Sequence, residues 1–206
     1  MYLVKTPIFI QKTYESCTWR IDSAENIYLT FDDGPDPDAT PWVLDILRSY
    51  DAKATFFCIG KKAEAHPVMI DRILDEGHSI GNHSYSHLSG WTTRSQDYLE
   101  DVHECSKHID SKLFRPPYGR LKPTQLKALI SEYEVIMWDV MCGDFEAKLS
   151  KEKCLNNITK NTNPGSIILL HDTSNSIDKL QYVLPKVLAH FSNKGLICEA
   201  LPMKSR

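Results

Sequence analysis

The chain has 206 residues, of which 42% are hydrophobic and 25% are charged, and its formal net charge is −3. These values are typical of a globular chain with one sizeable core. They exclude a basic footprint for nucleic acid, and no apolar run reaches the length of a transmembrane helix. We therefore expect a monomer with one domain over residues 26–206, on which an N-terminal tail over residues 1–25 packs.

Six cysteines are spread along the chain, at positions 17, 58, 105, 142, 154 and 198. None forms a Cys-x-x-Cys pair, so a thiolate zinc site is not expected, and we predict free thiols in a reducing compartment. The N-terminal apolar patch Ile8–Ile10 is flanked by lysines, and no small-residue cleavage site follows it. Because a signal peptide has such a site, the cytoplasm is favoured, with the cell envelope or periplasm as the alternative.

The first half of the domain alternates apolar strands with amphipathic helices. Thr40 is a natural N-cap and Pro41 suits the first helical position, whereas Gly77 ends a later helix. Apolar periodicity predicts the following ranges: strands over residues 27–31, 54–59 and 79–82, and helices over residues 40–50 and 66–76.

The second half continues the same alternation. Ser150 is a natural N-cap, and the nearly unbroken apolar run over residues 166–170 is typical of a strand that is buried on both faces. The pattern predicts helices over residues 93–109, 123–133, 150–162 and 177–193, and strands over residues 112–115, 135–140, 166–170 and 196–201.

Strands that alternate with helices indicate a parallel sheet of βαβ units. Seven predicted strands within about 180 residues suit a distorted, incomplete (β/α)7 barrel of the TIM type in a single domain. A doubly wound open sheet is the alternative. Both architectures place functional residues at the carboxyl ends of the strands.

Two adjacent carboxylates, Asp32 and Asp33, follow the first predicted strand directly, before Gly34 and Pro35 end it. Neighbouring carboxylates repel each other unless a cation or a proton lies between them. Turn chemistry is the alternative, because Asp favours turns. The pair alone does not decide between the two.

His83 and His87 follow the third predicted strand and are four residues apart. If this loop takes one helical turn, both imidazoles face the same side. Two imidazoles and one carboxylate suit a borderline-soft divalent ion, and three protein ligands leave a position open for water, as in catalytic zinc sites. Chance placement of two surface histidines is the alternative.

Titratable side chains also follow the later predicted strands. Arg115 precedes two prolines and could hold Asp32 in a bidentate pair. His171 ends the strand over residues 166–170, and Asp144 could orient its ring and raise its pKa. Because charged clusters cost desolvation and repulsion, stability does not demand such a convergence, which favours a functional site.

With these residues the chain resembles polysaccharide deacetylases of the NodB-homology type, carbohydrate esterase family 4. The resemblance covers about residues 27–172 and rests on five motifs in order: Thr30 to Pro35, His83 to His87, Arg115 to Gly119, Asp139 to Phe145, and Leu169 to His171. It implies a distorted (β/α) barrel. It also implies a metal-dependent hydrolase that removes N-acetyl groups from a peptidoglycan- or chitin-like glycan and releases acetate.

The resemblance also implies a role for each matched residue. The metal ligands would be Asp33, His83 and His87, and the ion zinc, with cobalt or nickel possible. Asp32 would be the general base and His171 the general acid. The other roles are these: Arg115 would hold Asp32, Asp144 would tune His171, the Tyr118 backbone N–H would help form the oxyanion hole, and Leu169 and Phe145 would line the acetyl pocket.

One departure from the family pattern is Phe145, where the family often has Trp, and it affects substrate preference more than catalysis. Two other functions stay open, a metal-dependent acetyl esterase or small-amide hydrolase and a catalytically silent carbohydrate-binding relative. An ester needs no strong general acid, so His171 favours an amide. Among the aromatic residues, Tyr85 and Trp91 are the preferred candidates to stack on sugars.

Overall fold

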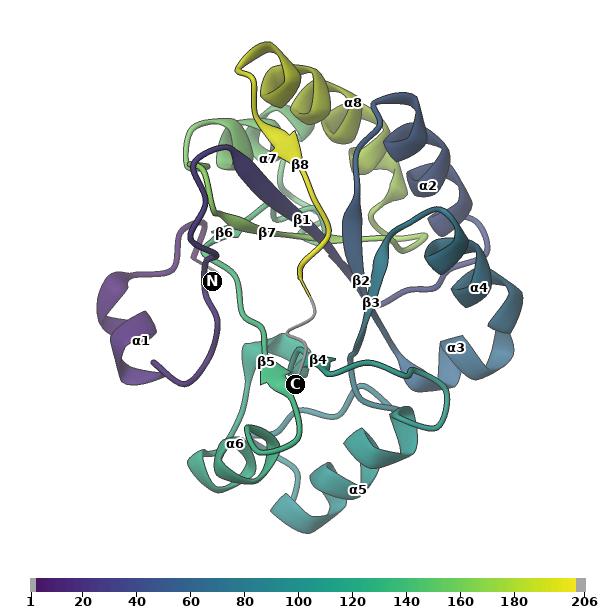
Figure 1. Ribbon diagram of the computed structural model, residues 1–206, viewed down its shortest axis with the longest axis vertical. Helices are drawn as coiled ribbons and strands as arrows, with labels where there is room; N and C mark the ends of the chain where they lie inside the picture. The colour runs from purple at the N-terminus through teal and green to yellow at the C-terminus, as the bar shows by residue number, and fades with distance from the viewer. Residues whose placement is uncertain (1–2, 203–206) are drawn as a thin grey trace.

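The computed structural model describes residues 3–202, which form one curled parallel sheet surrounded by helices (Figure 1). The strand order is β5-β4-β3-β2-β1-β7-β6, and β8 pairs with the start of β1. All of these pairings are parallel. The strands are β1 (Asn26–Asp32), β2 (Ala54–Cys58), β3 (Ser79–Asn82), β4 (Leu113–Phe114), β5 (Glu134–Val135), β6 (Val140–Met141), β7 (Ile167–His171) and β8 (Ile197–Cys198).

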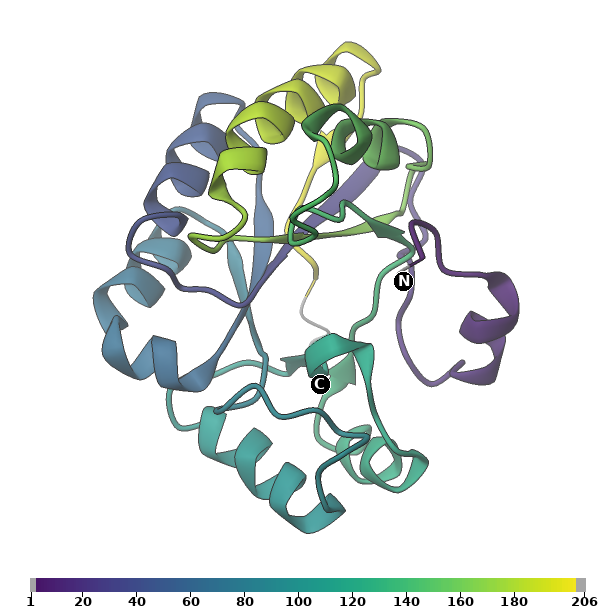
Figure 2. The same cartoon turned by 180° about the vertical axis from the view of Figure 1, so that it is seen from behind.

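Helices α2 to α8 lie outside the curl of the sheet, and Figure 2 shows α7 and α8 side by side in green and yellow-green. The predicted distorted, incomplete barrel is therefore confirmed. The helices are α1 (Ile8–Thr13), α2 (Thr40–Ser49), α3 (Gly60–Ala65), α4 (Pro67–Asp75), α5 (Ser95–Cys105), α6 (Pro123–Leu129), α7 (Lys151–Thr159) and α8 (Ile177–Asn193), with one 3-10 turn over Pro117–Gly119.

The barrel stays open between β5 and β6, which are its two ends. The single strand expected over residues 135–140 was wrong, because the chain pairs first with β4, leaves the sheet, and pairs again with β7. The N-terminal segment, with α1 at the left of Figure 1, runs along this crossing. Its backbone bonds are Thr18 N–H to Val135 O, Met137 N–H to Thr18 O and Met141 N–H to Val4 O, all 2.8 Å long.

Two predicted helix starts have different outcomes. Ser150 caps α7 as expected, since its hydroxyl accepts the Lys153 N–H at 3.2 Å. Thr40 is not the cap of α2, because the helix begins at Thr40 itself. The Thr40 hydroxyl instead accepts the Asp36 N–H at 2.8 Å and donates to the buried Asp172 carboxylate, so it links α2 to the end of β7.

The central strand β1 is buried on both faces. Ile27, Leu29 and Phe31 point outward into the main core beneath the helices. Because side chains alternate along a strand, Thr30 and Asp32 point inward. A charged residue therefore enters the barrel at the carboxyl end of its central strand. The six cysteines are buried and free, as expected.

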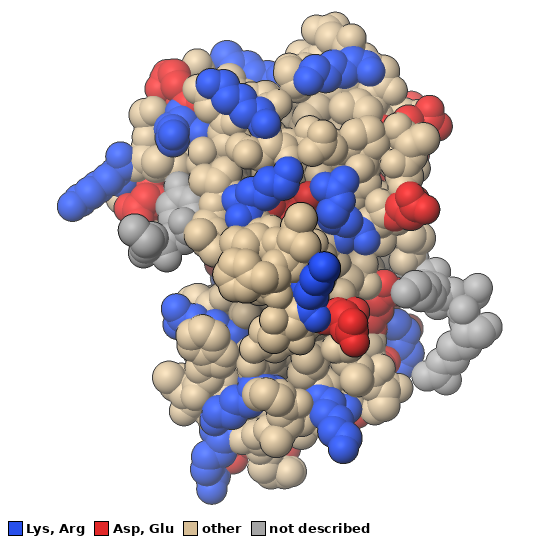
Figure 3. Space-filling view, turned by 90° about the vertical axis from the view of Figure 1, so that its left-hand side faces the viewer, with Lys and Arg blue, Asp and Glu red and all other residues tan. Residues whose placement is uncertain are grey.

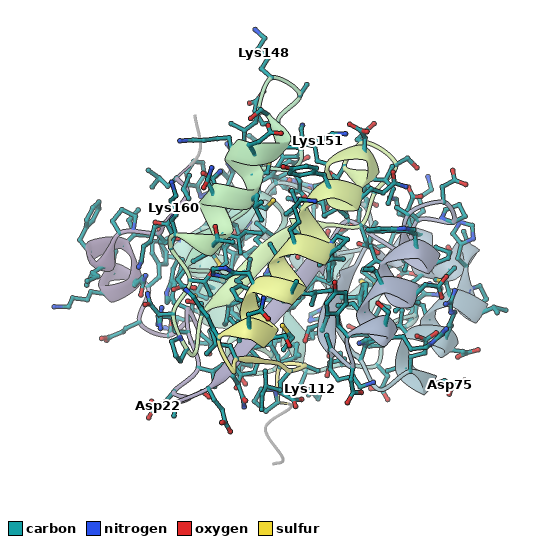
Figure 4. The ribbon with its side chains drawn as sticks, turned by 90° about the horizontal axis from the view of Figure 1, so that it is seen from above. Asp22, Asp75, Lys112, Lys148, Lys151 and Lys160 are labelled. Atoms are coloured by element: carbon teal, nitrogen blue, oxygen red, sulfur yellow. The ribbon has the colours of Figure 1, made fainter. Side chains whose placement is uncertain are left out.

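The two ends of the barrel differ in what they carry. Figure 4 shows Asp22, Asp75 and Lys112, which precede β1, β3 and β4, at one edge, and Lys148, which follows β6, at the other. The groups that follow the strands therefore lie toward the Lys148 edge. Figure 3 shows basic and acidic side chains interspersed over the face that carries α1. Within residues 3–202, every helix is too short or too polar to cross a membrane.

Candidate metal centre and active site

The backbone changes direction at Asp33, directly after the end of β1. It has a φ of 74°, a left-handed conformation that is costly for a residue with a Cβ. The Lys62 ammonium donates to the Asp33 carbonyl oxygen at 2.7 Å and so holds this turn from α3. The adjacent carboxylates, Asp32 and Asp33, consequently point to different partners.

His83 and His87 meet Asp33, although not through a helical turn. The predicted helical turn was wrong, because Ser84 and His87 have φ values of 59° and 57° in an irregular loop. The two imidazole rings nevertheless lie 5.1 Å apart. Nε2 of His87 is 3.0 Å from Asp33 Oδ1, and Nε2 of His83 is 3.4 Å from the same oxygen.

These three side chains fit a divalent cation. The carbonyl oxygen of Arg115 lies 2.8 Å from His83 Nδ1 and can only accept, so Nδ1 carries the proton and Nε2 offers a lone pair. Asp33 Oδ1 is buried and faces the Nε2 atoms of both histidines, which donate no hydrogen bond to it when each offers a lone pair to a cation. The three ligand atoms lie within 4.8 Å of one another. A positive ion would satisfy them all.

The charge of Asp33 fits the same role. Burial raises the pKa of Asp33, but His83, His87 and the charge of His171 outweigh burial and hold that pKa well below its usual range. A carboxylate that stays ionised beside two imidazoles is a suitable ligand for a borderline-soft ion.

Asp32 pairs with Arg115 inside the barrel. Arg115 is fully buried, and its Nη1 donates to Asp32 Oδ1 at 2.7 Å and to the Thr30 hydroxyl at 2.7 Å. The pair is not bidentate as expected, because Nε and Nη2 donate to the carbonyls of Ile136 and Met137. Arg115 therefore ties Asp32 to the crossing between β5 and β6.

The partly buried His171 and the fully buried Asp144 form the other pair. His171 Nδ1 lies 3.0 Å from Asp144 Oδ1, and the His171 backbone N–H donates to Asp144 Oδ2 at 2.8 Å. Burial lowers the pKa of His171, but the Asp144 charge and hydrogen bond, with Asp33 and Asp32, raise it to about 9. The contact expected between the two residues is present, and it favours the protonated imidazole.

A cavity of about 640 Å³ opens onto these groups. Behind its lining lie Arg115 and Asp144, which are both fully buried. Of the aromatic candidates, Trp91 lines it, whereas the Tyr85 ring packs 5.8 Å from His108 and its hydroxyl donates to Glu64. The predicted site residues on the lining are Asp32, Asp33, His83, His87, Tyr118, Phe145, Leu169 and His171.

Several residues at the site were not assigned from the sequence. Thr30 and Lys62 reach it through single hydrogen bonds, which apolar periodicity does not show. Trp138 lines the cavity from the crossing between β5 and β6, which had been predicted as a regular strand. Trp19 reaches it from the N-terminal segment, whose bonds to the crossing through the backbone of Thr18 are seen only in the structure.

Comparison with known proteins gives consistent matches. Residues 20–135 match the family model for polysaccharide deacetylase. A peptidoglycan-N-acetylglucosamine deacetylase of Bacillus cereus is 36% identical over 186 residues, which cover 86% of this chain and 87% of that protein. A chitooligosaccharide deacetylase of Azorhizobium caulinodans is 34% identical over 201 residues, covering 86% of this chain and 93% of that protein.

A solved structure extends the likeness to the fold. It is the crystal structure of a peptidoglycan N-acetylglucosamine deacetylase in complex with 4-naphthalen-1-yl-N-oxidanyl-benzamide. It superposes with a TM-score of 0.87 at 32% identity and covers 96% of this chain and 95% of that chain. The similarity therefore extends over nearly the whole length of both chains.

Proposed function

This chain belongs to the polysaccharide deacetylase family, and we propose that it removes N-acetyl groups from amino sugars of a peptidoglycan- or chitin-like glycan. The observation that carries the proposal is the meeting of three groups in one cavity: an Asp-His-His cluster, a carboxylate paired with a buried arginine, and a histidine paired with a buried aspartate. Amide hydrolysis uses all three.

We assign the cation to Asp33, His83 and His87, with zinc favoured and cobalt or nickel as alternatives. When bound, a divalent ion supplies Lewis acidity to the amide carbonyl and lowers the pKa of water. The carbonyl of Arg115 fixes the His83 ring, and Lys62 fixes the Asp33 backbone. These two contacts hold the ligands in place from behind.

Asp32 accepts the proton of the attacking water as general base, and Arg115 balances the carboxylate charge inside the barrel. The Tyr118 N–H donates to the developing oxyanion from its left-handed turn, where φ is 60°. His171 then donates its proton to the amine, because an amide nitrogen leaves poorly without one. Leu169 and Phe145 bound the space for the acetyl methyl group. The products are acetate and a free amino sugar.

The experiment that tests this function measures acetate release from N-acetylglucosamine oligomers and from peptidoglycan. Metal-stripped protein is assayed with and without added zinc or cobalt. Asp32→Asn is the test variant, and Asp38→Asn, which changes an exposed aspartate of the same loop, is its control. We expect release that depends on metal, is lost in Asp32→Asn and is kept in Asp38→Asn.

Two other results would contradict parts of this proposal. Metal binding without acetate release from either glycan would contradict the proposed substrate and support an esterase or small-amide hydrolase. Failure to bind metal would contradict the assigned ligands and support a carbohydrate-binding protein without catalysis. The complete pairing of Asp144 with His171 favours the amide hydrolase, since ester cleavage does not need a strong general acid.

A further inference from the structure

Three side chains lie next to one another along one wall of the cavity, beginning beside His87 of the metal centre. The Tyr118 ring lies 4.6 Å from the ring of His87. The Arg120 guanidinium lies 5.6 Å from the Tyr118 ring and 5.1 Å from the Trp91 ring. All three line the cavity and are exposed, Trp91 to 58% and Tyr118 to 59%. We call these three residues the rim platform.

The backbone beneath the rim platform is firmly tied together. Gly90 lies so close to the next segment that a Cβ there would come within 2.4 Å of the Arg120 carbonyl oxygen. The buried Gln125 accepts the Lys122 N–H at 2.9 Å and donates to the Gly90 carbonyl at 3.0 Å. The Lys122 ammonium adds a bond to the Thr93 carbonyl at 2.7 Å. Trp91 and Arg120 are therefore held next to each other before any substrate arrives.

The charge of Arg120 is not used by the protein itself. Across residues 3–202, its guanidinium has neither an ion pair nor a side-chain hydrogen bond. It is also the one lysine or arginine on the described lining, whose acidic residues are Asp32, Asp33 and Glu146. A guanidinium without an ion pair or a side-chain hydrogen bond keeps its N–H groups available for a planar anion.

We propose that Arg120 is a specificity residue that binds a carboxylate on a sugar next to the one being deacetylated. This inference rests on the proposed function and adds a substrate class to it, namely glycans with an acidic substituent rather than neutral oligomers. Trp91 and Tyr118 offer apolar faces for the sugar rings, and Arg120 between them offers two parallel N–H donors.

The test compares three substrates of equal length. One is the neutral tetramer of N-acetylglucosamine, the second is a peptidoglycan tetrasaccharide whose alternate sugars carry a lactyl carboxylate, and the third is the methyl ester of the second. Arg120→Gln should lower kcat/KM for the carboxylate about tenfold, through KM, and change the other two less than twofold. Arg120→Lys should recover part of the loss, because it keeps the charge without the planar fork.

Arg94→Gln is the matched control, since Arg94 is exposed, pairs with Asp97 and lies outside the cavity lining. It should leave all three substrates unchanged. An equal loss on all three substrates in Arg120→Gln, or no loss at all, would overturn the proposal. Thermal unfolding of each variant should show an unchanged Tm, because Arg120 is exposed.

A binding measurement separates this proposal from the proposed function. Calorimetry with metal-free protein compares the carboxylate with its methyl ester, so no turnover is needed. Tighter binding of the carboxylate that is lost in Arg120→Gln supports the inference even if no acetate is released. Acetate release without any preference for the carboxylate overturns the inference but is consistent with the proposed deacetylase function.

Discussion

The floor and the rim of the cavity are built by different interactions. Four residues form the floor, and each is at most 3% exposed: Asp32, His83, Arg115 and Asp144. They are held by charge pairs and by hydrogen bonds to backbone carbonyls. The side chains of the rim, which are the rim platform and Phe145, are exposed, and their contacts with one another and with the site histidines are ring contacts.

This difference separates catalysis from substrate choice. Fixed charges in a water-poor floor stabilise charge that develops in a reaction, and they need no reorganisation to do so. Exposed rings offer contact area to a substrate, and they can be substituted without disturbing the floor. Substitutions in the floor should therefore affect both stability and turnover, whereas those in the rim should affect the choice of substrate.

The largest effect is expected from Arg115→Met. This change leaves the Asp32 carboxylate buried without its partner and frees the carbonyls of Ile136 and Met137. Loss of one partner of a buried pair costs about 3–5 kcal/mol, so the free energy of unfolding in urea should fall by that amount. Acetate release should fall roughly 10²–10³-fold, because the general base is misplaced.

Arg120→Gln is the rim counterpart of that substitution and should change the free energy of unfolding by less than about 0.5 kcal/mol. Both variants remove one arginine charge next to the same cavity. Equal destabilisation by the two substitutions would contradict the separation of floor from rim.

The second prediction concerns the ionisation of His171 in metal-free protein. Its pKa should lie near 9, because Asp144, Asp33 and Asp32 outweigh the effect of burial. Asp144→Asn removes the nearest anion and should lower this pKa by about 1–3 units. Titration of the imidazole by NMR measures both values, and an unchanged pKa in Asp144→Asn would contradict the assigned cause.

The same shift predicts how stability depends on pH. The pKa of His171 is raised from 6.5 to about 9 on folding, so the native state binds the proton more tightly. Its contribution to stability, of the order of 3 kcal/mol, is complete below pH 6.5 and is lost as pH rises through 9. Urea unfolding at pH 6 and pH 9.5 should show this loss, and Asp144→Asn should reduce it.

The order of strands and helices could be predicted from the sequence because apolar periodicity records which faces are buried. Residues 27–31 and 166–170 are apolar apart from Thr30 and Ser166, and both ranges lie in central strands of the sheet. The split of residues 135–140 could not be predicted in this way. The split depends on Arg115 and Thr18, which are distant in the sequence. Both form hydrogen bonds with backbone groups of this segment.

The site residues could be predicted as a set, because strands of a parallel sheet end at the same edge. The contacts that these side chains make with one another were harder to predict. The helical turn between His83 and His87 and the bidentate bond of Arg115 both followed from local rules, and tertiary contacts overrode them. A side chain that acts through the hydrogen bonds of its hydroxyl, such as Thr30, cannot be identified from the pattern of apolar residues.

A smaller loss of stability than in Arg115→Met is expected from Thr30→Val, which nearly preserves shape and removes only the hydroxyl. The Thr30 hydroxyl accepts from Arg115 Nη1 at 2.7 Å and donates to the Ile168 carbonyl at 2.7 Å, and the side chain is fully buried. Removing it leaves a donor and an acceptor unsatisfied in the floor. The free energy of unfolding should fall by about 1–3 kcal/mol.

Thr92→Val makes the same chemical change in the rim loop beside Trp91. Thr92 is exposed, and its hydroxyl makes one long contact of 3.4 Å to the Ser89 carbonyl, so its loss should cost less than about 0.5 kcal/mol. A floor variant that is no less stable than the rim variant would show that Arg115 finds another acceptor. A selective loss in Thr30→Val would show instead that the floor depends on the hydrogen bonds of this hydroxyl, which lies outside the charged pairs.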